Sequence, residues 1–205
     1  MNFLSVWWLW GVTAGVPAAY ALYIAFFARH PAWRAHDQLR QDWLSAMSAQ
    51  AGTEILAVQT LRNSVMTATM TASTAALGLM GALGLAAPAL RALSEGGSSP
   101  AWTPALASEL TVMLLLVLTL VSTTLSIRYY HHAGFVCAMP VGSAMRAQWL
   151  PAGQLHLQSA GRLYSLGLRS LVWVTPFLAG LVQPVAGAVV AVLIATALLL
   201  ADRRP

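Results

Sequence analysis

The chain has 205 residues, of which 58% are hydrophobic and only 8% are charged. A soluble domain of this size carries about a quarter charged residues, because its surface must be polar. The composition therefore excludes an ordinary soluble fold and predicts an all-α integral membrane helical bundle, a single transmembrane domain over residues 1–205. The net charge of +5 comes from dispersed arginines without a dense basic patch, so we expect no nucleic-acid partner.

Three membrane spans are predicted in the first two thirds of the chain, since a spanning helix needs about 20 mainly apolar residues. They cover residues 3–27, 65–87 and 106–127. The helix of the second span is expected to begin near Thr53, and the Gly96–Pro100 stretch is expected to interrupt the chain after it. No arginine precedes the first apolar run, which we interpret as a retained span and not as a signal peptide.

The C-terminal apolar run from Tyr164 to Ala201 is too long for one ordinary span. Pro184 divides it, because proline removes a helical hydrogen bond and clashes with the preceding turn. We expect two short helices over 164–182 and 185–201. Two full crossings and a re-entrant hairpin both fit this pattern, so the chain has about five crossings, or four plus a hairpin.

The arginines predict the orientation of these spans. Positive charge gathers in cytoplasmic connections, and with five crossings the arginine-rich segments all fall on one side. Those segments are 28–64, 128–163 and the tail at 203–204. We therefore expect a multi-pass protein of a bacterial inner membrane, with its N-terminus outside and its C-terminus in the cytoplasm.

Two cytoplasmic segments have the pattern of amphipathic helices that lie at the membrane surface. Trp33–Met47 places apolar residues on an imperfect helical stripe beside Arg34, Asp37, Arg40 and Asp42. A weaker pattern of the same kind covers Gln154–Tyr164. Both segments are predicted to contact lipid headgroups.

The sequence Ile55–Asn63, Ile-Leu-Ala-Val-Gln-Thr-Leu-Arg-Asn, followed by Met66, resembles the signature of an uncharacterised membrane-protein family of bacteria and plants, the domain-of-unknown-function family 599. Further positions fit the same pattern over most of the chain: Trp43, Met47, Ser126-Ile127-Arg128, Gly167, Arg169, Pro176 and Pro184. The chain departs from it at Gly180, Val182-Gln183 and His131-His132. The resemblance implies a multi-span helical protein and brings no activity.

On the second helix, Gln59, Arg62 or Asn63, Met66, Thr69 and Ser73 recur at three- and four-residue steps, so they share one helix face. Five residues of this face are polar. They are Gln59, Arg62, Asn63, Thr69 and Ser73. One interpretation is a polar pathway with Arg62 at its cytoplasmic mouth. The other is helix packing, in which small hydroxyl residues let helices approach closely.

Charges near the membrane form a second group of candidates. Arg62, Arg128 and Arg169 are all expected toward the cytoplasmic side, where they either converge on an anion or acidic-lipid site or act as independent orientation signals. Glu54 is too far along its own helix to pair with Arg62 directly, so we expect it to meet Arg62 or Arg169 from another element. An intramembrane charge usually has a partner or a function.

No motif for catalysis, phosphate binding or metal binding is present in the sequence. His131 and His132 are adjacent, so they point about 100° apart and share one metal poorly. We expect no cofactor, no metal and no enzyme activity. The first hypothesis is a homo-oligomeric channel or transporter for an ion or small solute, in contact with membrane lipids; the alternative is an accessory or structural subunit of a larger membrane assembly.

Overall fold

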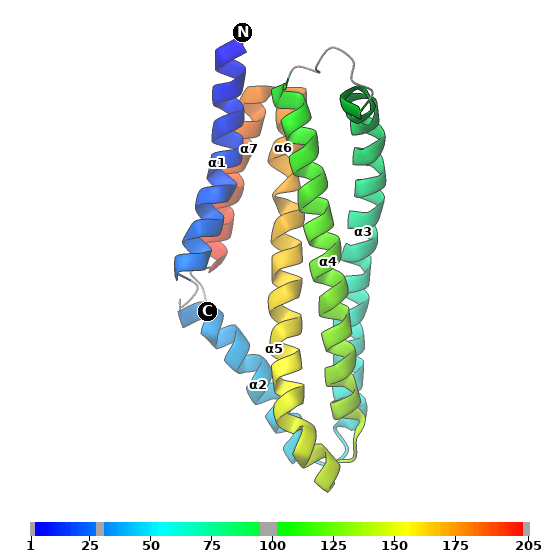
Figure 1. Cartoon of the computed structure of the whole chain (residues 1–205). Coiled ribbons are helices and arrows are strands. Elements are labelled where there is room, and N and C mark those ends of the chain that lie inside the picture. Colours follow the sequence, from blue (N-terminus) through cyan, green and yellow to red (C-terminus); the bar gives the residue numbers. More distant parts are fainter. Residues whose placement is uncertain (1–2, 28–30, 95–101, 203–205) are drawn as a thin grey trace. The chain divides into compact units, whose positions relative to one another are not determined.

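The structure, a computed structural model, describes residues 3–27, 31–94 and 102–202. Within these ranges it contains only helices and the turns between them, which confirms the all-α prediction. The helices are α1 (Phe3–Phe27), α2 (Pro31–Ala49), α3 (Glu54–Ser94), α4 (Pro104–Ala138), α5 (Ala144–Val172), α6 (Val174–Val182) and α7 (Pro184–Asp202); Figure 1 shows their course. The break predicted at Gly96–Pro100 lies outside the described residues.

Five helical segments in the described chain are long and apolar enough to cross a membrane, so the chain has the architecture of a helical membrane protein. They are Leu4–Phe26, Glu54–Arg91, Pro104–Ala138, Ala144–Val182 and Pro184–Asp202. Helix α3 has 41 residues, which corresponds to about 60 Å at the usual rise per residue. That is about twice the thickness of the hydrocarbon layer, so α3 also contributes structure outside the membrane.

The segment predicted as one helix over 164–182 is interrupted at Trp173, between α5 and α6. Pro176 explains the interruption, because it has no N–H to donate to the carbonyl of Val172 and its ring crowds that carbonyl. The turn predicted at Pro184 is present: Gln183 is extended, with φ −148° and ψ 118°. Pro184 then opens α7, a position where its missing N–H is no loss.

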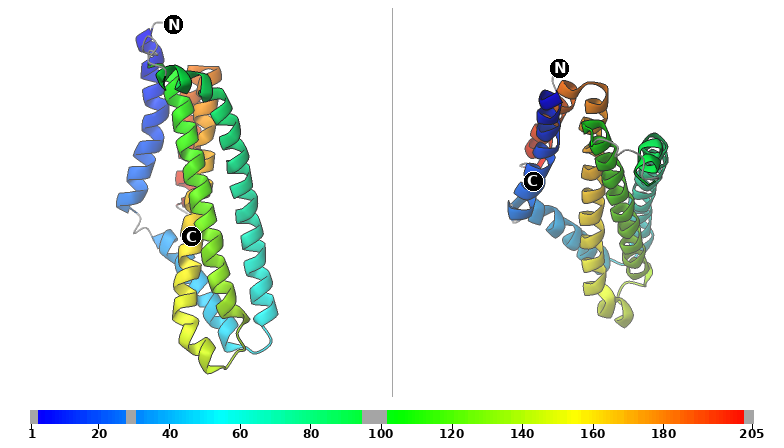
Figure 2. Two further views of the ribbon diagram at one scale, coloured as in Figure 1. Left: turned by 45° about the vertical axis from the view of Figure 1, so that its right-hand side comes forward. Right: turned by 45° about the horizontal axis from the view of Figure 1, so that its top comes forward.

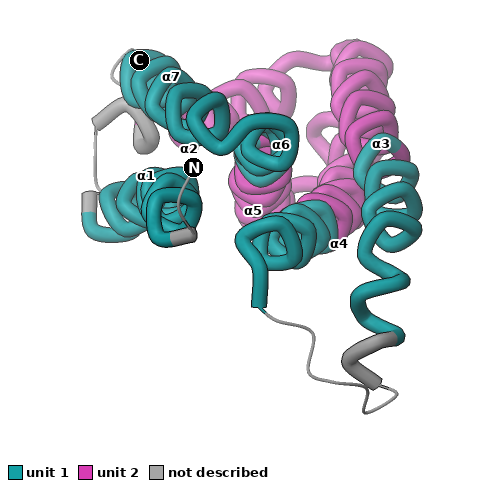
Figure 3. Tube along the Cα trace, turned by 90° about the horizontal axis from the view of Figure 1, so that it is seen from above, with its two compact units in different colours: residues 1–29, 74–118, 169–204 teal, residues 30–73, 119–168, 205 magenta. Residues whose placement is uncertain are grey.

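The chain divides into two compact units, which Figure 3 distinguishes by colour. Unit 1 comprises residues 1–29, 74–118 and 169–204, and unit 2 comprises residues 30–73, 119–168 and 205. Helices α3, α4 and α5 each contribute to both units, whereas α1, α6 and α7 belong to unit 1. Two further views of the ribbon are given in Figure 2.

Unit 2 has a core contributed by all four of its helices. Its buried members are Leu44, Ala57, Leu61, Tyr130, Ala133, Cys137, Leu157 and Ala160. Helix α2 supplies Leu44, which is fully buried. The predicted amphipathic helix at 33–47 is therefore present. Leu44, Trp43 and Met47 pack on protein, whereas Leu39 is 65% exposed.

Unit 1 has a separate apolar cluster around Tyr20, Trp173 and Ala191. The rings of Tyr20 and Trp173 lie 5.5 Å apart, which joins α1 to the start of α6. Helices α6 and α7 approach each other at two glycines: a Cβ on Gly187 would lie 2.8 Å from the Cα of Gly180. Only glycine permits backbones to come this close.

A buried arginine joins the ends of three helices in unit 2. Arg146, in the first turn of α5, is only 2% exposed. Its guanidinium donates to the carbonyls of Met47, Cys137 and Met139 at 3.3, 3.0 and 2.6 Å, and to the hydroxyl of Ser48 at 3.2 Å. The last carbonyls of a helix have no partner within the helix. Arg146 donates to one of them in α2, that of Met47, and to one in α4, that of Cys137.

We predict that Arg146→Met lowers the free energy of unfolding by about 2–3 kcal/mol, because buried carbonyls lose their donor. Chemical unfolding of the purified protein in mild detergent measures this. Arg128→Met is the matched control, since Arg128 is exposed, and its effect should be close to zero. Equal stability of the two variants would contradict the role given to Arg146.

A second prediction concerns the contact between α6 and α7. Gly187→Ala should destabilise the protein by about 1–3 kcal/mol, as overpacking does, because the new methyl meets the Pro176 carbonyl oxygen at 2.9 Å as well as Gly180. Gly81→Ala is the control, since its Cβ meets nothing within 4 Å. Alanine favours a helix over glycine by about 1 kcal/mol, so thermal unfolding should shift in opposite directions for the two variants.

Candidate functional site

The polar stripe, which we define as Gln59, Arg62, Asn63, Thr69 and Ser73, lies on an exposed face of α3. The structure brings the five residues onto one face, as their spacing predicts, and no other part of the described chain covers that face.

The polar groups of this face differ in what they require from their surroundings. The Thr69 hydroxyl donates to the carbonyl of Val65 at 2.9 Å, one helical turn back, so it can face lipid at little cost. The side chains of Gln59, Arg62 and Asn63 have no hydrogen-bond or ion-pair partner among the described residues. Their amide and guanidinium groups must therefore be satisfied from outside the described chain.

The three arginines expected toward the cytoplasmic side fall into different surroundings. Arg62 and Arg128 are exposed and belong to unit 2, whereas Arg169 belongs to unit 1. Arg169 is largely buried and forms an ion pair with Asp202, a partner that the sequence pattern does not indicate. Neither unit contains all three arginines.

Glu54 does not form the ion pair that was expected with Arg62 or Arg169. Its Oε1 atom accepts a hydrogen bond of 2.9 Å from the backbone N–H of Val141. Glu54 is the first residue of α3 and precedes the predicted span at 65–87 by about three helical turns. Glu54 therefore fastens the connection after α4 to the start of α3.

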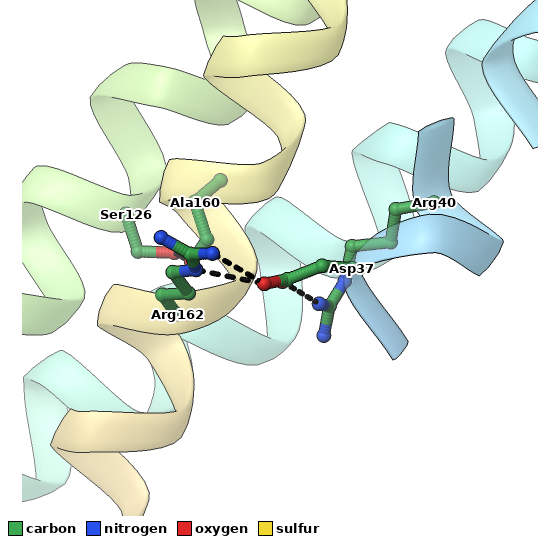
Figure 4. Close-up of polar contacts among 5 residues, drawn as sticks. All are labelled: Asp37, Arg40, Ser126, Ala160 and Arg162. Carbon is green, nitrogen blue, oxygen red and sulfur yellow. Dashed lines mark hydrogen bonds and ion pairs between the residues drawn. The ribbon is translucent and has the colours of Figure 1, made fainter. Parts of the chain in front are cut away.

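An ionic cluster joins α2 to α5 within unit 2, as Figure 4 shows. The Asp37 carboxylate lies between two guanidinium groups: Arg162 Nη2 is 2.6 Å from Asp37 Oδ2, and Arg40 Nη1 is 3.3 Å from Asp37 Oδ1. The Asp37 side chain is 13% exposed and that of Arg162 is 60% exposed. One carboxylate thus serves two cations, and the cluster keeps a net positive charge.

A glycine in α5 makes room for this cluster. A Cβ on Gly161 would lie 2.3 Å from the Arg40 Cζ atom, so any larger residue would push the guanidinium away from the helix. Behind the cluster, the Ser126 hydroxyl donates to the Ala160 carbonyl at 2.7 Å and joins α4 to α5. The exposed N–H groups of Arg162 remain able to attract an anion from the medium.

The structure places His132 and His156 together in unit 2. Their rings lie 5.2 Å apart, and the His156 ring also stacks on Tyr129 at 5.6 Å, while His131 is exposed. No group of three or more His, Cys, Asp or Glu side chains in the described ranges is arranged to hold a metal ion. The contacts of His156 are aromatic packing between α4 and α5.

A polar cluster in unit 1 joins α1, α5 and α7. The Asp202 carboxylate accepts from Arg169 on one oxygen and from the Tyr20 hydroxyl, at 2.7 Å, on the other. The side chains of Arg169 and Asp202 are 18% and 14% exposed. Asp202 therefore fixes the end of α7 against two other helices.

Sequence reasoning missed the partners in these clusters. The three-residue spacing of Asp37 and Arg40 is the one local signal, since such residues are neighbours on a helix. Asp37 and Arg162 lie 125 residues apart in sequence, and Tyr20 and Asp202 lie 182 apart. No local pattern can reveal such pairs.

We predict that Asp202→Asn destabilises the protein by about 2 kcal/mol, because it leaves Arg169 largely buried without a counter-charge. The double variant Asp202→Asn/Arg169→Met should recover part of this loss, since it removes the unpaired charge. Thermal unfolding in detergent measures both. Arg169→Met alone completes the comparison. If the destabilisation of the double variant equals the sum of the two single effects, the ion pair does not stabilise this region.

Comparison with known proteins identifies the family of the chain. No curated protein and no solved structure matches it. A family model does match residues 8–205, almost the whole chain. The match agrees with the resemblance seen at Ile55–Asn63, and the chain belongs to the family described as protein of unknown function, DUF599.

Proposed function

We propose that the protein is a non-enzymatic homo-oligomer of a bacterial inner membrane that passes a small anion or polar solute between its protomers. The pathway follows the polar stripe of α3, and Arg62 stands at its cytoplasmic mouth. The observation that carries this proposal is that all five stripe residues are exposed on one helix face. A pathway along this face needs a second protomer to close it.

The physical argument starts from the groups that the chain leaves unsatisfied. A charged or amide side chain at the membrane boundary is unfavourable against lipid, and such groups usually face protein or water. Gln59, Arg62 and Asn63 have no partner in the described chain. Thr69 continues the face into the predicted span, and its hydroxyl oxygen still offers a lone pair to a passing solute.

The positive charge of Arg62 favours an anion. The guanidinium stands before the predicted span at 65–87, where the orientation rule places it in the cytoplasm. An unpaired arginine at the end of a narrow path raises the local concentration of anions.

A second candidate function is supported by the methionines of the same face. Met66, Met70 and Met80 are 58%, 66% and 72% exposed. Flexible methionine side chains adapt to irregular protein surfaces, so this face also suits contact with a different membrane protein. In that case the chain is an accessory subunit and the stripe is a contact surface.

We predict that Arg62→Gln lowers anion flux in proteoliposomes by roughly tenfold, the change expected from losing about 1.4 kcal/mol of attraction at the mouth. Chloride and nitrate efflux from liposomes of defined composition measures this. Arg128→Gln is the matched control, because Arg128 is an exposed arginine of the same unit on another helix, and it should leave the flux unchanged.

The oligomer itself is tested by cross-linking. Thr69→Cys should form a disulfide between protomers on mild oxidation, whereas Val121→Cys, an exposed position on α4, should not. Cys137 is fully buried and stays in place. A monomer without flux that purifies in fixed ratio with another membrane complex would replace the pathway with the accessory role.

A further inference from the structure

Unit 1 contains a cavity that neither the polar stripe nor the ionic clusters use. Its volume is about 340 Å³, and it is a partly open pocket lined by α3, α4, the end of α5 and α6. Gly78, Gly81 and Ala82 create the space, because they present almost no side chain. All residues that line this cavity belong to unit 1, whereas the polar stripe belongs to unit 2.

One carboxylate lines this mostly apolar cavity. Glu109 stands in the second turn of α4, and its neighbours around the space include Val112, Leu116 and Leu178. Glu109 is half-buried, and it forms no ion pair or hydrogen bond with any residue that the structure describes. Asp202, the other carboxylate described in unit 1, is satisfied by Arg169 and Tyr20.

We propose that this cavity binds a small lipophilic organic cation, with its charged centre at Glu109 and its apolar body among the leucine and valine side chains. An unpaired carboxylate in a membrane helix is unfavourable by itself, and a cation in contact with it offsets that penalty. This binding site is independent of the proposed pathway along the polar stripe.

The surroundings of Glu109 select this occupant over others. Mg²⁺ and Ca²⁺ need several oxygen ligands, whereas the residues around Glu109 are almost all apolar. The cavity is near the lower end of the usual range for small-molecule pockets, which is about 300–1,000 Å³. It therefore accommodates a compact organic ammonium or phosphonium ion, and a two-chain lipid is too large to enter it whole.

Binding of tetraphenylphosphonium to the full chain in detergent, measured by equilibrium dialysis, tests the proposal. We expect saturable binding of one cation per chain. Glu109→Gln should weaken it by about tenfold or more, since one charge interaction of about 1.4 kcal/mol is lost. Asp42→Asn is the control for total charge, because Asp42 is an exposed residue of unit 2, and it should bind as the unchanged protein does.

A second variant tests the cavity and not the charge. Gly81→Leu fills the space without meeting any atom at its Cβ, so it should fold and should also lose the cation. Tetraphenylborate, which has the same shape and the opposite charge, should not bind. The proposal would be overturned if the unchanged protein and Glu109→Gln bound tetraphenylphosphonium with equal affinity, or if the two probe ions bound equally. A bound lipid that the cation does not displace would also overturn it.

Discussion

A polypeptide in lipid must satisfy its backbone hydrogen bonds within itself, and this constraint determines most of the architecture of the chain. Helices α3 and α4 have 41 and 35 residues, more than a membrane requires. Their ends therefore lie where side chains can form hydrogen bonds with the terminal backbone groups. At the start of α5, Ser143 accepts from the backbone N–H of Arg146 at 3.2 Å, a common helix cap. The Arg146 side chain meanwhile donates to one carbonyl at the end of α2 and to one at the end of α4. Unit 2 depends on this junction, because the connections between its helices meet there.

The elements that follow from local composition could be predicted from the sequence. The apolar runs indicate the spans, the stripe at 33–47 indicates α2, and Pro184 indicates the turn before α7. The interruption at Trp173 could not be predicted with the same certainty, because a proline such as Pro176 can either bend a helix or end it. Pro17, for comparison, lies inside the continuous helix α1. Which outcome occurs depends on packing, and here Trp173 packs against Tyr20 from the other end of the chain.

The surroundings of the arginines could not be predicted from the sequence. All of them serve equally well as orientation signals, yet their surroundings in the fold differ completely. Arg146 is buried among carbonyls, Arg169 is paired with Asp202, and Arg40 lies over Gly161. Arg62 and Arg128 are exposed. These differences come from partners that are distant in sequence, so the spacing of charges along the chain contains no information about them.

Hydroxyl groups and charges differ in what they reveal about function. A threonine on a membrane helix can bond to its own backbone, as Thr60, Thr67 and Thr71 do, so its presence is compatible with lipid, protein or a solute path. A guanidinium or carboxylate cannot be satisfied in this way. Among the residues that the structure describes, the informative groups are therefore charges without an internal partner, and Arg62 and Glu109 are two such groups. Arg62 lies on an exposed face, which favours an anion or a neighbouring protein as its partner. Glu109 lines a mostly apolar cavity, which favours a cation with an apolar body.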